Sequence, residues 1–204
     1  MDRKAHWEGV YTTKQLTEVS WYQAVPARSL ELLRRAGVGP ETTLIDIGGG
    51  DSTLVDAVLS EHLGRVTVLD ISATALARAR ERLGARAGEV TWIEADVTRV
   101  ELPARSFDVW HDRAAFHFLT QAEDRARYVE RAATALRPGG TLIIATFAPD
   151  GPTRCSGLDV AGYSPEGLAR ELGTAFVLQQ GLADVHRTPS GAEQRFTFAV
   201  FQRD

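Results

Sequence analysis

One short stretch, residues 43–52, constrains the fold of this chain more than any other. It reads Thr-Leu-Ile-Asp-Ile-Gly-Gly-Gly-Asp-Ser, an apolar run that contains Asp46 and leads directly into three glycines. The pattern predicts a buried strand, a tight turn through Gly48 and Gly50, and a helix that begins near Ser52. Glycine permits both a sharp bend and the close approach of a ligand, because it has no Cβ atom. The free N–H groups at the helix start then favour a nucleoside-like ligand at this turn.

Composition limits the class of protein. The chain has 204 residues, 44% of them hydrophobic, and a formal net charge of −4, which suits a single α/β domain over residues 1–204. The acidic balance disfavours a nucleic-acid surface built on bulk charge. No run reaches the ~18 apolar residues of a membrane span, and the start does not read as a signal peptide. The sequence predicts a cytoplasmic protein without nucleic-acid or membrane partners and leaves its oligomeric state open.

Strand and helix patterns alternate along the chain. Five strand-helix alternations, followed by two strands with no helix between them, predict a doubly wound, Rossmann-like α/β fold. Its seven-stranded sheet is expected to be mostly parallel, with an antiparallel final strand and helices on both faces. The expected strands are 43–47, 65–69, 90–93, 107–110, 141–147, 176–182 and 195–201, and the expected helices are 26–36, 52–61, 72–83, 120–136 and 164–172.

Two local details complete this prediction. Residues 148–162 are rich in Gly, Pro and small polar residues, which is typical of a loop. Thr120 and Glu123 have the spacing of a capping box at the start of the helix over 120–136. The face that this helix is expected to bury consists of Ala122, Ala126, Val129, Ala133 and Leu136.

Acidic residues close several of the expected strands. Asp46, Asp70, Asp96 and the pair His111-Asp112 all follow apolar runs. Any one of them can be explained as a helix cap or turn former. Because parallel strands place their carboxyl ends at one edge of the sheet, together they predict a ligand site there.

The glycine turn differs from a dinucleotide-binding fingerprint. That fingerprint needs a third glycine where this chain has Thr53, so a nicotinamide cofactor is disfavoured. Asp70 nevertheless lies about 20 residues after the turn, where a carboxylate binds ribose hydroxyls. These residues suit a nucleoside cofactor without a pyrophosphate.

Four ordered motifs resemble those of class I S-adenosylmethionine-dependent methyltransferases. The motifs are residues 44–50 (LIDIGGG), 69–72 (LDIS), 94–97 (EADV) and 136–142 (LRPGGTL), and the match extends over about residues 40–147. The resemblance implies S-adenosyl-L-methionine as cofactor and S-adenosyl-L-homocysteine as its product. It assigns Asp70 to the ribose, Ile71 to the adenine face and Asp96 to the adenine amino group. The cofactor residues expected in this way are Tyr11, Trp21, Asp46, Gly48, Gly50, Ser52, Asp70, Ile71, Asp96, Val97 and His111.

The N-terminal aromatics resemble the lid of small-molecule methyltransferases of the thiopurine, halide and thiol type. Trp7, Tyr11 and Trp21 fall within residues 3–22, where they either anchor a terminal helix or cover a ligand. The sequence thus divides into a helical lid and first helix (1–36), a cofactor-binding core (40–147), and a substrate-side loop with a strand pair (148–204).

The sequence says less about the residues that bind the methyl acceptor. Residues 111–119 are expected to face the methyl group, with Asp112 orienting an amine or a base, Arg113 binding an anion and His117 acting as a base. His117 can equally be a packed histidine between two phenylalanines. His186 is expected in a surface loop, and the five scattered histidines predict no metal site.

Three functions remain open at this stage. The first is methyl transfer to an O, N or S atom of a small molecule. The second is methylation of a protein lysine, because Asp112-Arg113-Ala114 is similar to a segment of lysine methyltransferases that modify an elongation factor. The third is a cofactor-binding domain without catalysis.

Overall fold

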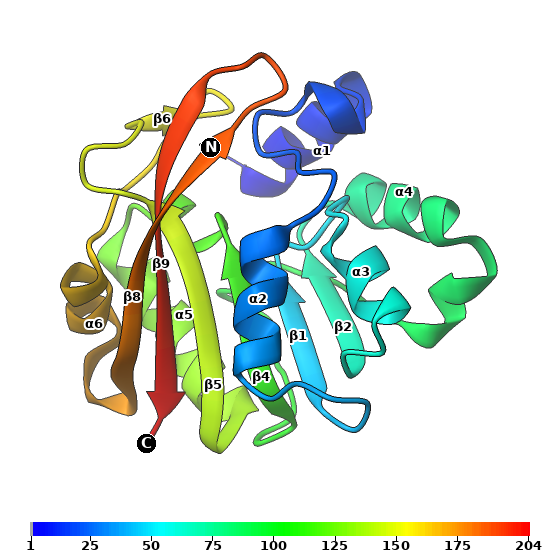
Figure 1. The fold of residues 1–204 in the computed structure, drawn as a ribbon. Helices are drawn as coiled ribbons and strands as arrows, with labels where there is room; N and C mark the ends of the chain where they lie inside the picture. Colours follow the sequence, from blue (N-terminus) through cyan, green and yellow to red (C-terminus); the bar gives the residue numbers. More distant parts are fainter. Residues whose placement is uncertain (1) are drawn as a thin grey trace.

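The computed structural model describes residues 2–204, and its centre is one seven-stranded sheet, which Figure 1 shows from one face. The strands lie in the order β3-β2-β1-β4-β5-β9-β8. Only β9 runs antiparallel to its neighbours β5 and β8, as the sequence predicts. The strands are β1 (Thr43–Ile47), β2 (Arg65–Asp70), β3 (Thr91–Glu94), β4 (Phe107–Arg113), β5 (Leu136–Phe147), β8 (Phe176–Arg187) and β9 (Glu193–Arg203).

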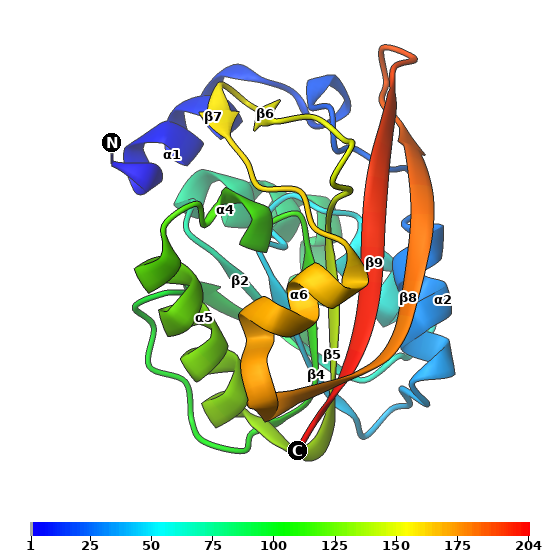
Figure 2. The ribbon, with the colours of Figure 1, turned by 90° about the vertical axis from the view of Figure 1, so that its left-hand side faces the viewer.

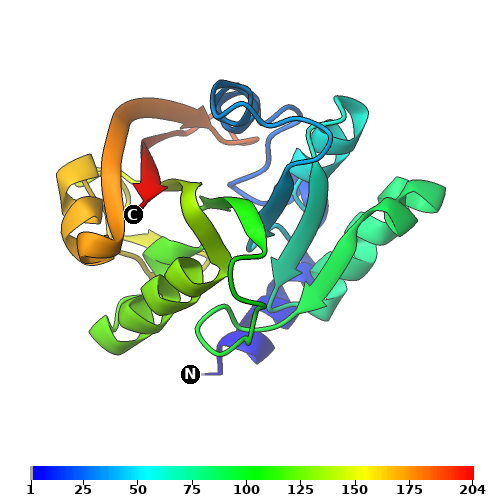
Figure 3. The ribbon, with the colours of Figure 1, turned by 90° about the horizontal axis from the view of Figure 1, so that it is seen from below.

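Helices cover both faces of the sheet (Figure 3). Buried leucines and valines of α2, α3 and α4 pack on one face, together with side chains of β1 and β2. The other face is covered by α5 and α6, around Trp110, Tyr128 and Leu168. The predicted doubly wound architecture is therefore confirmed. The helices are α2 (Ala27–Arg35), α3 (Leu54–Ser60), α4 (Ala73–Leu83), α5 (Ala122–Ala135) and α6 (Pro165–Leu172).

Two small elements lie beyond the end of the sheet that carries the glycine turn. Helix α1 (Arg3–Thr13) and a short hairpin of β6 (Arg154–Cys155) and β7 (Leu158–Asp159) occupy this end, as Figure 2 shows. The hairpin corrects the prediction of a plain loop over 148–162. Two-residue strands carry too little periodicity to be read from sequence.

Helix α5 departs from the prediction in its start and its face. It begins at Ala122 with Gln121 as N-cap, and no side chain caps it, so the expected capping box is absent. Its buried residues are Tyr128, Ala132 and Ala135, each one position before an expected residue. The expected Val129 and Ala133 are partly buried against the same core, and Leu136 is buried at the start of β5. The cause of this shift is Tyr128, which faces the core. Its buried hydroxyl accepts a hydrogen bond from Trp110 Nε1 and donates one to Asp112 Oδ2.

Strand β4 is longer than predicted. It continues through His111 and Asp112 to Arg113, whereas the sequence placed these three residues after the strand. Since side chains alternate along a strand, His111 and Arg113 point to one face of the sheet and Asp112 to the other. This register decides which of them reach the site.

Candidate functional site

The glycine turn packs tightly against the acidic strand ends. Gly48 and Gly50 have positive φ angles of 64° and 35°, a conformation that favours glycine. A Cβ atom on Gly50 would lie 2.5 Å from Asp70 Oδ2, and one on Gly49 would lie 2.5 Å from Asp46 Oδ2. The turn is therefore a cradle that only glycine can form, with two carboxylates pressed against it.

Asp70 closes β2 and is buried, with 4% of its surface exposed. Its Oδ1 accepts a hydrogen bond of 2.8 Å from the backbone N–H of Ser72. Burial raises the pKa of Asp70 to about 7, and the negative charge of Asp46 adds to this effect. A buried carboxylate without a neighbouring cation is suited to accept hydrogen bonds from a ribose diol.

A main cavity lies at the carboxyl ends of the strands, underneath α1. Next to it lies a smaller cavity on the other side of the glycine turn, and Tyr11, Trp21, Gly48 and Arg113 line both. Of the other predicted residues, the main cavity is lined by Asp70, Ile71, Asp96, Val97 and His117, and the smaller one by Asp46, Ser52 and His111. Gly50 lines neither cavity, because its place is against the carboxylate of Asp70.

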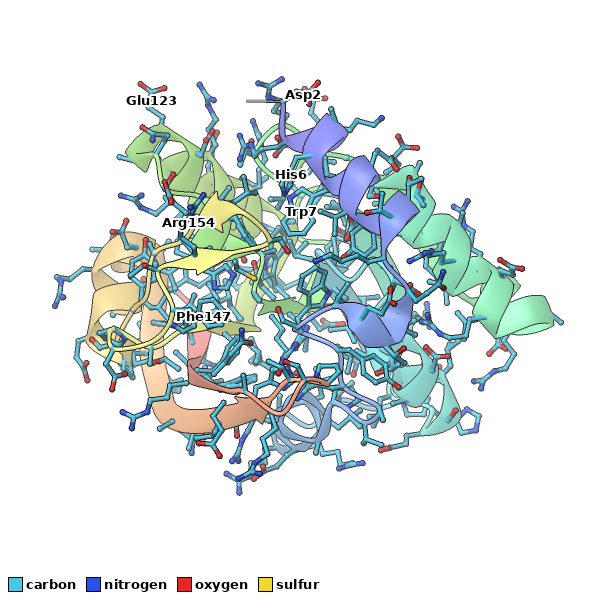
Figure 4. All side chains as sticks on the ribbon, turned by 90° about the horizontal axis from the view of Figure 1, so that it is seen from above. Asp2, His6, Trp7, Glu123, Phe147 and Arg154 are labelled. Carbon is cyan, nitrogen blue, oxygen red and sulfur yellow. The ribbon has the colours of Figure 1, made fainter. Side chains whose placement is uncertain are left out.

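Aromatic rings form the roof of the main cavity. The ring of Trp7 lies 4.9 Å from Phe118 and 5.9 Å from Trp21, both edge to face. Tyr11 packs on Trp21 at 6.3 Å and is itself buried. Figure 4 looks down on this roof, with Trp7 labelled on α1 and Phe147 below the hairpin. The N-terminal aromatics therefore both anchor α1 and line a cavity.

Helix α1 is held down by Glu8. Its carboxylate accepts hydrogen bonds from the backbone N–H of Ala73 at 2.6 Å and of Thr74 at 3.2 Å, and from Ser72 Oγ at 3.1 Å. Burial opposes ionisation of this group, but the bonds from Thr74 and Ala73 outweigh it and lower the pKa of Glu8. A carboxylate at the start of a helix is also favoured by the helix dipole. Glu8 thus attaches the roof to α4.

The segment that follows α1 is fixed by side chains from three parts of the fold. The carbonyl oxygen of Ser20 accepts a hydrogen bond of 2.7 Å from His186 Nε2. The carbonyl oxygen of Trp21 accepts one of 3.0 Å from Arg113 Nη1. Thr53 Oγ1 donates to the carbonyl of residue 23 at 2.8 Å. His186 is buried within β8, so its expected place in a surface loop is wrong. The sequence predicts a strand over 176–182 only, whereas β8 continues to Arg187.

His111 supports Asp46. Its Nδ1 lies 2.7 Å from Asp46 Oδ1, and its Nε2 lies 2.9 Å from Ser29 Oγ on α2. Both ring nitrogens are therefore occupied by protein partners. The side chain of His111 lies beside the smaller cavity and holds the carboxylate of Asp46 in place.

Asp112 does not reach either cavity. Its oxygens accept from the backbone N–H of Ala115 at 2.8 Å and of Phe116 at 3.1 Å, and from the Tyr128 hydroxyl at 2.7 Å. Burial raises its pKa to about 6. The structure contradicts the expectation that Asp112 orients the acceptor. Instead it fixes the turn after β4 from the opposite face of the sheet.

His117 lines the main cavity but is not placed to act as a base. Its Nδ1 accepts a hydrogen bond of 3.3 Å from the backbone N–H of Phe147. Burial, assisted by the charge of Arg113, lowers the pKa of His117 to about 3, so the ring is neutral. With Nδ1 accepting, the proton is on Nε2, which has no partner within residues 2–204. His117 is therefore a hydrogen-bond donor to the cavity.

Sequence reasoning missed several residues that line the main cavity. Phe118 and Cys155 come from segments already singled out, but Phe147 and Phe196 belong to the expected strands 141–147 and 195–201. Gln194 joins them from the start of β9. No local signal marks these positions, because only the pairing of β9 with β5 brings them to the site.

The residues present fit a nucleoside cofactor. The glycine cradle, the buried carboxylate of Asp70 and the second acid, Asp96, lie along the β1-β2-β3 side of the main cavity. Asp96 already has protein partners, since its Oδ1 accepts from the backbone N–H and the hydroxyl of Thr98 and its Oδ2 lies 3.6 Å from Arg3 Nη2. Over residues 2–204 no three His, Cys, Asp or Glu side chains are grouped to hold a metal ion. No helix in the same range has the length and apolarity to cross a membrane.

Comparison with known proteins agrees with this geometry. Residues 44–140 match the family model described as a methyltransferase domain. An uncharacterized methyltransferase of Mycobacterium tuberculosis is 36% identical over 104 residues, which are 51% of this chain and 50% of that protein. A ubiquinone/menaquinone biosynthesis C-methyltransferase of Ectopseudomonas mendocina is 32% identical over 142 residues, 67% of this chain and 54% of that protein. The chain thus spans about half the length of these curated relatives.

The fold agrees as well. A crystal structure of a SAM-dependent methyltransferase from Anabaena variabilis superposes with a TM-score of 0.77 at 18% identity, covering 100% of this chain and 96% of that one. The order of motifs, the single antiparallel strand and the glycine cradle beside Asp70 are all present here. The chain therefore belongs to the class I S-adenosylmethionine-dependent methyltransferases.

Proposed function

We propose that this chain transfers a methyl group from S-adenosylmethionine to a small-molecule acceptor. The observation that carries the proposal is the main cavity, which extends from the acids of β2 and β3 to an aromatic half beside β4, β5 and β9. One end suits a nucleoside and the other a flat apolar partner. When bound, the cofactor supplies an activated methyl group whose leaving group is a neutral thioether.

In this proposal the cofactor residues have distinct tasks. Asp70 accepts hydrogen bonds from the ribose, Ile71 and Val97 pack on the adenine, and Asp96 meets its amino group. Tyr11, Trp21 and the glycine turn at Gly48 enclose the remainder. Asp46, Ser52 and His111 line the smaller cavity, which receives the amino-acid end.

The chain contributes positioning and exclusion of water rather than acid–base chemistry. The roof of Trp7, Tyr11 and Trp21 shields the reacting atoms, and aligned approach of two bound reactants accounts for most of the acceleration in such a displacement. His117 is neutral with its proton on Nε2, so it does not take a proton from the acceptor. The acceptor atom is proposed to be O, N or S, and carbon joins them because the relative from E. mendocina is a C-methyltransferase.

Lysine methylation in a protein is the less favoured alternative. A lysine ammonium needs a carboxylate or a carbonyl cage near the methyl group to bind and lose its proton. Within the described chain, the only carboxylates that line the main cavity are Asp70 and Asp96, at the cofactor end. The acceptor half offers Arg113, which repels an ammonium.

Two measurements test the proposal. Isothermal titration should show that S-adenosylhomocysteine binds and that Asp70→Asn weakens the binding. Failure of the unmodified protein to bind at millimolar ligand excludes both the enzyme and a non-catalytic cofactor domain.

Turnover then separates those two possibilities. Release of S-adenosylhomocysteine is followed with a panel of small phenols, enols, amines and thiols, and separately with a protein extract. Product formed only with the protein fraction would favour the lysine alternative. Binding without product in any arm would favour the non-catalytic domain.

A further inference from the structure

The main cavity carries opposite charges at its two ends. Its acids, Asp70 and Asp96, close the neighbouring strands β2 and β3. Arg113 and His117 lie across the glycine turn, on β4 and the 3-10 turn Phe116–Phe118. Because β1 separates β2 from β4 in the sheet, these two acids lie in a different half from Arg113 and His117. Arg3, the remaining cation of the lining, lies in the acidic half, where its Nη2 is 3.6 Å from Asp96 Oδ2. A nucleoside at the acidic half leaves the basic half to the acceptor.

Arg113 is a largely buried cation without an ion-pair partner in the described chain, since the nearby carboxylates of Asp184 and Asp46 are paired with other side chains. It stays protonated at neutral pH, although burial lowers its pKa to about 10. One N–H group donates to the carbonyl of Trp21, and the guanidinium carbon lies 5.1 Å from the centre of the Phe196 ring. Among the ion pairs within residues 2–204, none includes Arg113. Burying an unpaired cation is costly, and a bound anion would offset that cost.

His117 supplies a second free donor next to it. His117 lines the same cavity; its Nε2 is fully buried and has no partner in the described chain, while Nδ1 accepts from the N–H of Phe147. A buried donor without an acceptor loses free energy, so its presence points to a missing ligand atom. Both residues therefore bring donor groups to the same half of the cavity.

The walls around these donors are apolar and flat. Phe118, Phe147 and Phe196 line the cavity around His117 and Arg113, and the His117 ring packs at 4.6 Å from Phe118 and 4.7 Å from Phe147. The thiol of Cys155 is neutral, because burial raises its pKa. Such walls suit a planar molecule, and they provide no negative group that would compete for Arg113.

We infer that the methyl acceptor is a planar, largely apolar small molecule with one ionised oxygen group, held by the Arg113 guanidinium and the Nε2–H of His117. This rests on the proposed function and adds the acceptor class to it. An acceptor that arrives as an anion needs no base. Its electron pair forms the bond to the methyl carbon, the pair of the broken S–C bond stays on sulfur, and no proton is released. A phenolate or enolate and a carboxylate share this chemistry.

The test is equilibrium binding to protein saturated with S-adenosylhomocysteine, at mildly alkaline pH. The probes are para-nitrophenolate, para-nitrobenzoate and the neutral ether para-nitroanisole. At least one anion should bind roughly 10-fold or more tightly than the ether, as expected for charge-assisted hydrogen bonds. Preference for the phenolate identifies an enol or phenol acceptor, and preference for the benzoate identifies a carboxylate.

Matched variants assign the effect to the two donors. Arg113→Met should abolish the preference for the anion, while Arg113→Lys should retain part of it. His117→Asn keeps an acceptor for the N–H of Phe147 but removes the Nε2 donor, so anion affinity should fall several-fold. His117→Gln places an amide N–H near the Nε2 position and should restore some affinity. Arg34→Met removes a paired arginine on α2 away from the cavity and should leave the preference unchanged.

Two outcomes would overturn the inference. One is equal binding of both anions and the ether to the unmodified protein. The other is a loss of S-adenosylhomocysteine affinity in Arg113→Met as large as the loss for the anion, which would assign Arg113 to the cofactor. The anion series is also measured without S-adenosylhomocysteine. Failure of S-adenosylhomocysteine to bind would contradict the proposed function, and this series distinguishes that result from a failure of the anions to bind.

Discussion

Asp70 shows how a single residue connects stability with binding. Its pKa in the folded protein is about 7, against 3.8 for an ordinary aspartate, with burial as the main cause. The folded state therefore holds the proton more tightly than the unfolded chain does. The free energy of unfolding consequently falls as the pH rises from about 4 to about 7, and the loss is complete above that range.

Replacing this carboxylate should separate the two effects. In Asp70→Asn we expect the midpoint of thermal unfolding without ligand to rise by roughly 2–4 °C above pH 7, which is about 1 kcal/mol for a chain of this size. The gain should shrink toward pH 4, and S-adenosylhomocysteine affinity should fall roughly tenfold or more. Thermal unfolding and titration calorimetry measure both. A lower midpoint with unchanged affinity would make Asp70 a purely structural residue.

His117 yields a prediction about protonation. Its pKa is lowered to about 3, so its nitrogen NMR signals should stay those of a neutral ring, with the proton on Nε2, throughout the range in which an exposed histidine titrates. Since the unfolded chain takes up a proton near pH 6.5 and the folded protein does not, this group reduces stability as the pH falls from 6.5 to about 3. A titration near pH 6.5 would refute the neutral donor.

For single residues, the position in the site could be predicted from the sequence where the residue belongs to a local motif. The glycine turn, Asp70 and Asp96 follow their strands directly, so their place at the sheet edge could be predicted. The position of Asp112 could not be predicted, because β4 continues through this residue and each further residue of a strand points to the opposite face of the sheet. The state of His117 depends on the backbone N–H of Phe147, which is 30 residues away in sequence.

Among the elements, α1 is the one whose attachment can be tested most directly. Glu8→Gln removes the negative charge that accepts from Ala73, Thr74 and Ser72. We expect hydrogen exchange in α1 to accelerate several-fold, because a neutral amide binds these donors more weakly than a carboxylate does. Mass spectrometry of peptides from residues 2–14 measures the change.

A matched control is available on α4. Glu81 is exposed on that helix, and Glu81→Gln changes the net charge by the same amount without touching the attachment. Equal acceleration in both variants would show that general electrostatics, and not the contact of Glu8, holds the helix.

The elements themselves were predicted well wherever hydrophobic periodicity was long. Strands β1 to β5 and helices α2 to α6 all exist, and α4 follows Ser72, which caps it by accepting from the N–H of Ala75. The β6–β7 hairpin and the rotation of α5 were not predictable. The first is too short for a periodic signal, and the second is set by the buried hydroxyl of Tyr128.

In the whole molecule, β9 lies between β5 and β8, so residues 148–204 are part of the same sheet as the cofactor core. Phe198 pairs with Ala145 and Leu182 in the two neighbouring strands and is 1% exposed. Phe198→Ala should reduce the free energy of unfolding by about 3–5 kcal/mol. Urea unfolding should remain a single transition with an unchanged m-value.

Val177→Ala is the control for this experiment. Val177 lies on β8 but is 52% exposed, and its truncation should change stability by no more than about 0.5 kcal/mol. A second unfolding transition in either protein would contradict the prediction that residues 1–204 form one domain.

The attachment of α1 to α4 has a kinetic consequence. Each time α1 lifts, the N–H groups of Ala73 and Thr74 lose the carboxylate of Glu8, and the rings of Trp7 and Tyr11 meet water. These losses disfavour a lifted form. We therefore expect the attachment of α1 to slow the exit of a molecule bound beneath the helix, in addition to the effect of the molecule's own contacts.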